Sequence, residues 1–148
     1  MRGRYFSEFE VGQQFTSQGR TVTEADVVLF AGISGDFNPL HTDETFAATT
    51  PFGRRIAHGM LAASISTGLG QTLGIFEGTT LALIGQTFEY KGPVFFGDTI
   101  RLVLTVETCT PSRKPGRGVV VFRSEIRKQD DSAAIVGTWT VQFRDRES

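Results

Sequence analysis

The chain has 148 residues, about the length of one ordinary domain, so we expect a single domain over residues 1–148 with one hydrophobic core. Fifteen basic residues against sixteen acidic ones give a formal net charge of -1, which argues against nucleic-acid or anionic-membrane partners. Because no apolar run approaches the roughly 18 residues needed to cross a bilayer, we expect a cytoplasmic protein. Cys109 is the single cysteine, which excludes an internal disulfide and a multi-cysteine zinc site, and we interpret it as a packed side chain.

The first half of the chain has helical patterns. Thr23 is followed three positions later by Asp26, and this N-cap signal predicts a helix of about ten residues that ends near residues 32–35. The residues expected to face inward are Val27, Phe30 and Ala31. A short second helix is predicted over residues 44–48. The segment 59–73 has no charged residue on any face, which predicts a longer helix enclosed by the rest of the fold.

The second half alternates with the period of strands. Ile100, Leu102, Leu104 and Val106 share one face of a predicted strand, while polar residues occupy the other face. Further strands are predicted at residues 14–22, 80–90, 120–127 and 135–143. The fold class is therefore α+β, with a curved antiparallel β-sheet wrapped around a long central helix.

The segment from Gly35 to His41 contains a candidate acid–base pair. Asp36 and His41 would point about 140° apart on a continuous helix, because each residue advances the helix by roughly 100°. Pro39 disfavours helical geometry at Asn38, and Asn38 accepts turn conformations, so the sequence supplies a bend that could bring the two side chains together. A carboxylate beside an imidazole can accept and donate protons near neutral pH.

Two other interpretations of this segment stay open. Asp36 could cap a helix while His41 is an ordinary turn residue. Asp36, His41 and Asp43 could also hold a metal, although a zinc or iron site would usually include another histidine.

A second candidate lies at the start of the uncharged helix. Gly59 would leave a backbone N–H of the first turn without a side chain in the way, which suits an oxyanion hole for a thioester carbonyl. The alternative is that Gly59 merely permits close packing. His58 could be catalytic, but we favour a histidine at the helix start that bonds a backbone carbonyl.

Four segments carry a resemblance to a known family. They are Gly35-Asp36-Phe37-Asn38-Pro39-Leu40-His41, Phe46-Ala47-Ala48, Ile56-Ala57-His58-Gly59-Met60 and Lys91-Gly92-Pro93-Val94-Phe95-Phe96-Gly97-Asp98. Together they resemble the MaoC-like dehydratases and R-specific enoyl-CoA hydratases, and the resemblance extends over most of the chain.

The resemblance implies a hotdog fold, assembled as a homodimer by edge-to-edge pairing of sheets. It also implies that Asp36 and His41 hold the water that adds to C3 of a trans-2-enoyl thioester, and that the Gly59 N–H holds the thioester oxygen. Asn38 would steady the loop, and Thr67 falls where family members often carry a serine near the site. Which of the pair is the base and which the acid stays open.

The basic turn at residues 112–117 is a further candidate site. Its cations, Arg113, Lys114 and Arg117, could meet the phosphates of coenzyme A or of phosphopantetheine, although a solvated hairpin loop is the simpler interpretation. The acyl chain would lie along apolar side chains beside the central helix, where Gly68 and Gly70 could leave room. An equal interpretation is that these glycines allow close packing of the helix on the sheet.

The sequence therefore predicts a lyase of the hydratase type, which interconverts trans-2-enoyl and 3-hydroxyacyl thioesters with R stereochemistry and without cofactor or metal. The alternatives are a hotdog acyl thioesterase and a non-catalytic subunit that binds acyl thioesters. The carrier (coenzyme A or acyl carrier protein), the acyl length and the physiological direction are left open.

Overall fold

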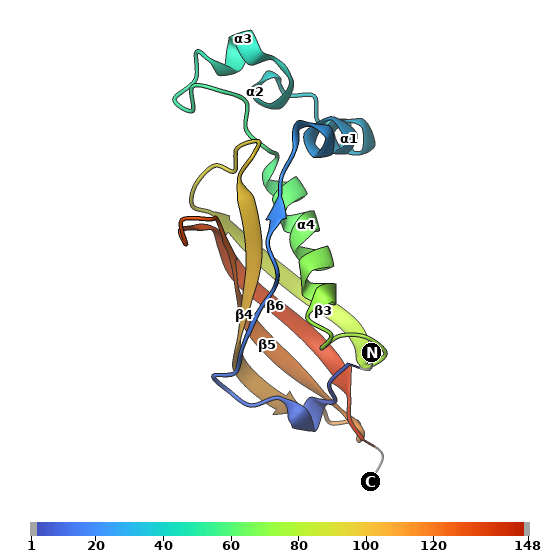
Figure 1. The fold of residues 1–148 in the computed structure, drawn as a ribbon. Coiled ribbons are helices and arrows are strands. Elements are labelled where there is room, and N and C mark those ends of the chain that lie inside the picture. The colour runs from blue at the N-terminus through green and yellow to red at the C-terminus, as the bar shows by residue number, and fades with distance from the viewer. Residues whose placement is uncertain (1–2, 147–148) are drawn as a thin grey trace.

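In the computed structural model, residues 3–146 are described, and they form one antiparallel sheet with helices at one face and one end (Figure 1). The strands are β1 (Gln14–Thr16), β2 (Arg20–Thr21), β3 (Thr80–Tyr90), β4 (Thr99–Pro111), β5 (Arg117–Arg127) and β6 (Ala133–Arg144). The helices are the 3-10 turn η1 (Phe6–Glu8), α1 (Glu24–Ser34), α2 (Pro39–Thr42), α3 (Glu44–Ala47) and α4 (Gly59–Thr72). The predicted α+β class is confirmed, and α2 is an element that the sequence did not predict.

The sheet has the strand order β1-β4-β5-β6-β3, and β2 continues the edge beside β1 by pairing with β4. β4, β5 and β6 follow one another as hairpins, as the alternating pattern predicted. A register shift between Val106 and Thr108 breaks the regular pairing of β4 with β5, and such irregularities increase the local twist and bend of a strand. The sheet therefore curves around α4.

Helix α4 packs its apolar side against the inner face of this sheet, as Figure 1 shows. Leu61, Ile65 and Leu69 are buried in the core beside sheet residues that include Leu102 and Phe122. Gly70 lets the helix approach Trp139, because a Cβ there would lie 3.0 Å from the indole ring. The interpretation of Gly70 as a packing residue is therefore the one that fits.

The prediction that α4 is enclosed is only half correct. One side of the helix is exposed in the single chain, and its residues are Met60, Ser64, Thr67, Gly68, Gln71 and Thr72. These side chains are small, amide, hydroxyl or thioether groups without charge, so the absence of charge did not mean burial on every side within one chain.

Strand β3 beside this helix is the long free edge of the sheet. All but two of its residues are exposed, including Leu83 at 54% and Ile84 at 57%. A long exposed edge with apolar side chains is a surface that natural sheets usually cover.

Helices α1, α2 and α3 gather at the end of the molecule where α4 begins (Figure 1). Thr23 and Asp26 form the predicted capping box, in which each side chain accepts from the other residue's backbone N–H. Helix α1 is capped at its C-terminal end by Gly35, whose φ of 76° is a left-handed conformation that favours glycine. The chain is thus turned sharply just before Asp36.

Cys109 is half-buried and its thiol faces the Phe9 carbonyl, with 3.7 Å between the sulfur and the oxygen. Burial raises the pKa of the Cys109 thiol, which disfavours the reactive thiolate. This supports the interpretation of a packed side chain. Among residues 3–146, no helix is both long and apolar enough to cross a membrane.

Candidate active site

A cavity of about 630 Å³ opens at the N-terminal end of α4. Its walls come from α1, the loop after it, α2, the segment before α4, α4 itself, the end of β3, the segment that follows β3, and β6. The lining residues are Phe30, Ser34, Asp36, His41, Phe52, Ile56, Ala57, His58, Gly59, Met60, Ala62, Tyr90, Lys91, Gly92, Pro93, Val94 and Ile135. An apolar cavity with a few converging polar groups is the usual form of a small-molecule site.

Asp36 stands on the loop between α1 and α2. Its backbone N–H donates to Ser34 Oγ at 3.1 Å, and its carboxylate oxygen Oδ1 accepts from the Asn38 N–H at 3.1 Å. These local bonds hold the loop in a tight turn, while the residue as a whole stays exposed to the cavity. The carboxylate can therefore meet water or a ligand.

The bend predicted at Pro39 is the start of α2. Asn38 is the N-cap, with non-helical backbone, and its side-chain oxygen accepts from the Leu40 N–H at 3.0 Å. Pro39 follows at the first helical position, where a missing N–H costs nothing. Asn38 does not line the cavity, so its contact fits the expected loop-steadying role. One short turn then carries His41 back toward Asp36.

His41 is buried to 9% exposure, and its ring is fixed by one hydrogen bond. Nδ1 lies 2.8 Å from the Ile56 carbonyl oxygen. Because a carbonyl only accepts, the neutral ring must carry its proton on Nδ1, which leaves Nε2 as an acceptor. Burial lowers the pKa of His41 below 6.5, the Ile56 hydrogen bond and the Asp36 charge oppose this shift, and His58 adds to it. The neutral form of the ring is therefore favoured.

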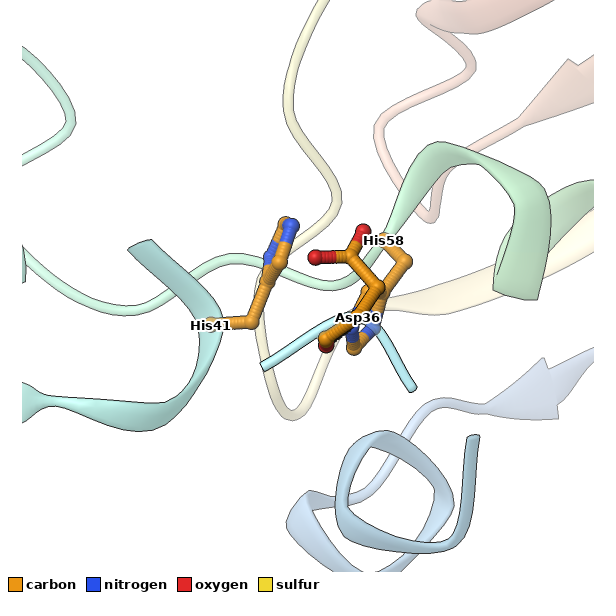
Figure 2. Close-up of side chains that lie close together, drawn as sticks. All are labelled: Asp36, His41 and His58. Carbon is orange, nitrogen blue, oxygen red and sulfur yellow. Dashed lines mark hydrogen bonds between the residues drawn. The ribbon is translucent and has the colours of Figure 1, made fainter. Parts of the chain in front are cut away.

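The structure brings the predicted pair together. A carboxylate oxygen of Asp36 and a ring nitrogen of His41 lie within 4.8 Å of each other, and Figure 2 shows the two groups side by side. A water that donates one hydrogen bond of about 2.8 Å to each of two acceptors spans about 4.4 Å between them. We expect that one water molecule can bridge two side chains at a separation of this order.

Gly59 is the first residue of α4 and lines the same cavity. Its N–H has no acceptor within the helix, because the first turn lacks a preceding carbonyl. The Tyr90 ring lies so close that a Cβ on residue 59 would be 2.4 Å from ring carbon Cε1. Gly59 therefore serves close packing and also lines the cavity, while its role as an oxyanion donor stays a prediction.

His58 bonds a backbone carbonyl, as we favoured from the sequence. Its Nε2 lies 2.9 Å from the Asp36 carbonyl oxygen, and its ring stacks on His41 with 3.9 Å between centroids. Asp36, His41 and His58 each offer a ligand atom within 4.8 Å of the others. The ring planes of the two histidines differ by only 28°, so their in-plane lone pairs do not converge on one ion. In the alternative metal set, Asp43 is turned away, because its carboxylate caps α3 at Phe46.

Other predicted residues lie away from the cavity. Thr67 is on the exposed side of α4, where its hydroxyl donates to the Ser64 carbonyl, and it lies eight residues (about 12 Å) along the helix from Gly59. Arg113, Lys114 and Arg117 belong to the β4–β5 hairpin. This hairpin is at the end of the sheet where β5 pairs Gly118 with Phe143, whereas the cavity is at the end where Ile126 pairs with Ile135. Within one chain the three cations are about 26 Å from the cavity.

The sequence analysis did not name some of the lining residues. One of them, Ser34, did have a signal, which is its place beside the Gly35-Asp36 turn. Tyr90 and Ile56 carried no signal, because Tyr90 reaches Gly59 through the sheet register and Ile56 acts through its backbone oxygen.

The sheet, its central helix and the Asp36–His41 pocket define a protein of the hotdog class. The fold recurs, with a TM-score of 0.80 and 20% identity over 99% of this chain and 46% of the other, in a conserved hypothetical protein from Mycobacterium tuberculosis with a double hotdog fold. That likeness shows the fold alone.

The chain belongs to the MaoC like domain family, whose model matches residues 7–126. It is 42% identical to an (R)-specific enoyl-CoA hydratase of Rhodospirillum rubrum, over 81% of this chain and 78% of the relative. The crystal structure of a MaoC-like dehydratase from Rhodospirillum rubrum matches with a TM-score of 0.89 and 29% identity, over 99% of this chain and 100% of the other. The family resemblance predicted from the four segments is confirmed.

Proposed function

We propose that this chain is a hydro-lyase that reversibly adds water to trans-2-enoyl thioesters and forms (R)-3-hydroxyacyl thioesters. The observation that carries the proposal is the convergence of the Asp36 carboxylate, the His41 ring and the first amide of α4 in one cavity. The name of the Rhodospirillum rubrum relative, an (R)-specific enoyl-CoA hydratase, supports both the substrate class and the stereochemistry.

The resting site suits one water molecule. The Asp36 carboxylate and His41 Nε2 are both acceptors, since the His41 proton is on Nδ1. A water between them donates both of its hydrogens, so its oxygen lone pairs are left to face the substrate. This is the orientation that a nucleophilic water needs.

In the chemical step, the water oxygen forms a bond to C3 while one O–H bond breaks and its proton passes to Asp36 or His41. The electron pair of the C2–C3 double bond moves toward the thioester, and the Gly59 N–H stabilises the charge that develops on the thioester oxygen. C2 then takes a proton from the site. The proton that water gives to the pair balances the proton that C2 gains. The step needs no cofactor or metal, and its reversal is dehydration.

The apolar walls suit the acyl part of the substrate. Phe30, Met60, Val94 and Ile135 line the cavity around the polar groups and can exclude bulk water from the reacting atoms. Turnover of one acyl group carried by coenzyme A and by acyl carrier protein, measured side by side, tests which carrier is used.

We further propose that two copies pair through β3. A strand that pairs with its own copy about a two-fold axis must run antiparallel, so the Thr80 end of one β3 meets the Tyr90 end of the other. Leu83, Ile84 and the exposed side of α4 would then be covered. In this antiparallel arrangement, the β4–β5 hairpin of each copy lies at the end of the joined sheet where the other copy has its cavity. Contact of Arg113, Lys114 and Arg117 with carrier phosphates is therefore proposed across the dimer, and the cytoplasmic location stays a prediction.

The test is the hydration of crotonyl-CoA, followed by the loss of ultraviolet absorbance. Asp36→Asn and His41→Ala should each reduce kcat by about 10²- to 10⁴-fold, the usual contribution of a positioned acid or base. Asp130→Asn, on the exposed β5–β6 turn, is a matched control that should keep full activity. Equal rates in all four proteins would reject the proposal. Release of free thiol without hydration would instead identify a thioesterase, and binding without turnover would identify a silent subunit.

A further inference from the structure

His58 is a buried side chain that the proposed chemistry leaves without a role. It is 3% exposed and precedes Gly59 directly in the chain. Its carbonyl accepts from the Leu61 N–H at 3.1 Å and the Ala62 N–H at 3.3 Å, so its backbone is fixed by the first turn of α4. The position of the His58 ring is therefore tied to the position of the Gly59 amide.

The ring connects this helix start to the Asp36 loop. His58 Nε2 donates to the Asp36 carbonyl oxygen at 2.9 Å, across 22 residues of sequence. The other hydrogen bonds of Asp36 in the described part of the chain reach only Ser34 and Asn38, two residues away on either side. The local bonds shape the turn, whereas the bond from His58 sets where the turn stands relative to α4 (Figure 2).

The same ring supports His41 from one face. The two imidazoles stack at 3.9 Å, and the Phe30 ring lies 4.9 Å from His58 at an angle of 58°. The His41 ring is thus held by the Ile56 carbonyl at its edge and by His58 at its face. Such double support restricts both the tilt and the rotation of the ring.

Neither nitrogen of His58 can exchange a proton with a substrate. Nε2 is engaged by the Asp36 carbonyl, and Nδ1 is buried from solvent with no hydrogen-bond partner among residues 3–146. We propose that His58 is a positioning residue, which holds the Asp36 loop, the His41 ring and the Gly59 amide at their mutual spacing. This inference rests on the proposed hydratase function, because it concerns the same three groups.

Because Nδ1 lacks a hydrogen-bond partner in the described part of the chain, the positioning role of His58 can be separated from its effect on the stability of the fold. A buried acceptor without a donor destabilises a fold, so replacing His58 by Phe removes that cost while it also removes the Nε2 donor. His58→Phe keeps a flat ring between Phe30 and His41. His58→Gln places an amide N–H where Nε2 was, and His58→Asn is too short to reach the Asp36 carbonyl.

The experiment compares wild type, His58→Gln, His58→Phe and His58→Asn in crotonyl-CoA hydration. His58→Phe and His58→Asn should lose about 10- to 100-fold in kcat with KM changed less than about threefold, because a displacement of about 1 Å at a reacting group has effects of this size. His58→Gln should stay within about fivefold of wild type. Equal kcat values in the Gln and Asn variants would overturn the proposal. If the Phe variant does not fold, the comparison of His58→Gln with His58→Asn is sufficient for the test.

Hydrogen exchange of the amides at residues 35–38 supplies a readout that needs no activity. Exchange should be about tenfold faster in His58→Asn than in His58→Gln, because only the latter keeps the bond to Asp36. Identical exchange in the two variants would also overturn the proposal. An inactive wild type would reject the proposed function alone, since the exchange result would still report on His58.

Discussion

Replacing Gly59 by Ala tests the amide at the start of α4. An ideal Cβ there would lie 2.4 Å from Tyr90 Cε1, 2.8 Å from Cδ1 and 2.9 Å from Cζ. Carbon atoms prefer separations of about 3.5–4.0 Å, so one of the two groups must move by more than about 1 Å.

The Tyr90 ring is the part that moves. The start of α4 is anchored by buried core residues, whereas Tyr90 is half exposed and its hydroxyl donates only to the Met60 sulfur at 3.4 Å. Turning the ring costs about 0.5–1.5 kcal/mol, and the better helix propensity of Ala returns up to about 1 kcal/mol. The free energy of unfolding should therefore change by less than about 1 kcal/mol.

The activity should fall much further than the stability. The new methyl group stands in the cavity beside the amide that would receive the thioester oxygen. If the carbonyl is held about 1 Å farther away, the N–H···O distance passes beyond the range of a hydrogen bond. Loss of one oxyanion-hole donor costs about 2.7–4 kcal/mol, which corresponds to a 10²- to 10³-fold decrease in kcat.

The assay is steady-state hydration of crotonyl-CoA together with thermal unfolding. Gly32→Ala is the matched control, because Gly32 is also helical and a Cβ there meets nothing within 4 Å. This control should keep full activity and gain up to about 1 kcal/mol of stability. If Gly59→Ala hydrated crotonyl-CoA within threefold of wild type, the amide would not be the oxyanion donor.

Three further changes follow from the geometry. Because the folded state lowers the pKa of His41, the unfolded chain binds more protons than the folded chain as the pH drops from 6.5. The free energy of unfolding should therefore fall in this pH range. The value of kcat/KM should fall in the same range, because His41 becomes protonated. A half-maximal point of the acid limb above pH 6.5 would contradict this. Asn38→Ala removes the cap of α2 and should cost about 0.5–2 kcal/mol in denaturant unfolding together with part of kcat, and unchanged values of both would contradict the cap's role. Ile84→Lys should convert the proposed dimer to a folded monomer, as measured by light scattering. A wild-type protein that is already monomeric would contradict the proposed β3 interface.

Local signals were enough to predict much of the fold. Thr23 and Asp26 predicted the start of α1 because capping is decided within four residues. The alternation from Ile100 to Val106 predicted the buried face of β4 because side chains of a strand alternate between faces. The burial of α4 was overestimated, since an uncharged helix can reserve one side for a partner, and a single sequence does not distinguish the two cases.

The candidate site also contains residues that local sequence patterns predict and contacts that they do not predict. Asp36, His41 and Gly59 could be found because the turn at Pro39 and the helix start at Gly59 are encoded nearby. The contacts that orient them come from residues distant in sequence. The Ile56 carbonyl selects the His41 tautomer, and Tyr90 reaches Gly59 from the end of β3. These contacts depend on tertiary structure, and no local pattern encodes them.

In the proposed reaction, Asp36 and His41 deliver the elements of one water molecule to the double bond. The most direct measurement is hydration of crotonyl-CoA in D₂O, with the product analysed for deuterium at C2 and for configuration at C3. We expect one deuterium at C2 and the R configuration in wild type, and product formation decreased at least about 100-fold in Asp36→Asn and in His41→Ala. Undiminished formation of the same labelled product by either variant would contradict it.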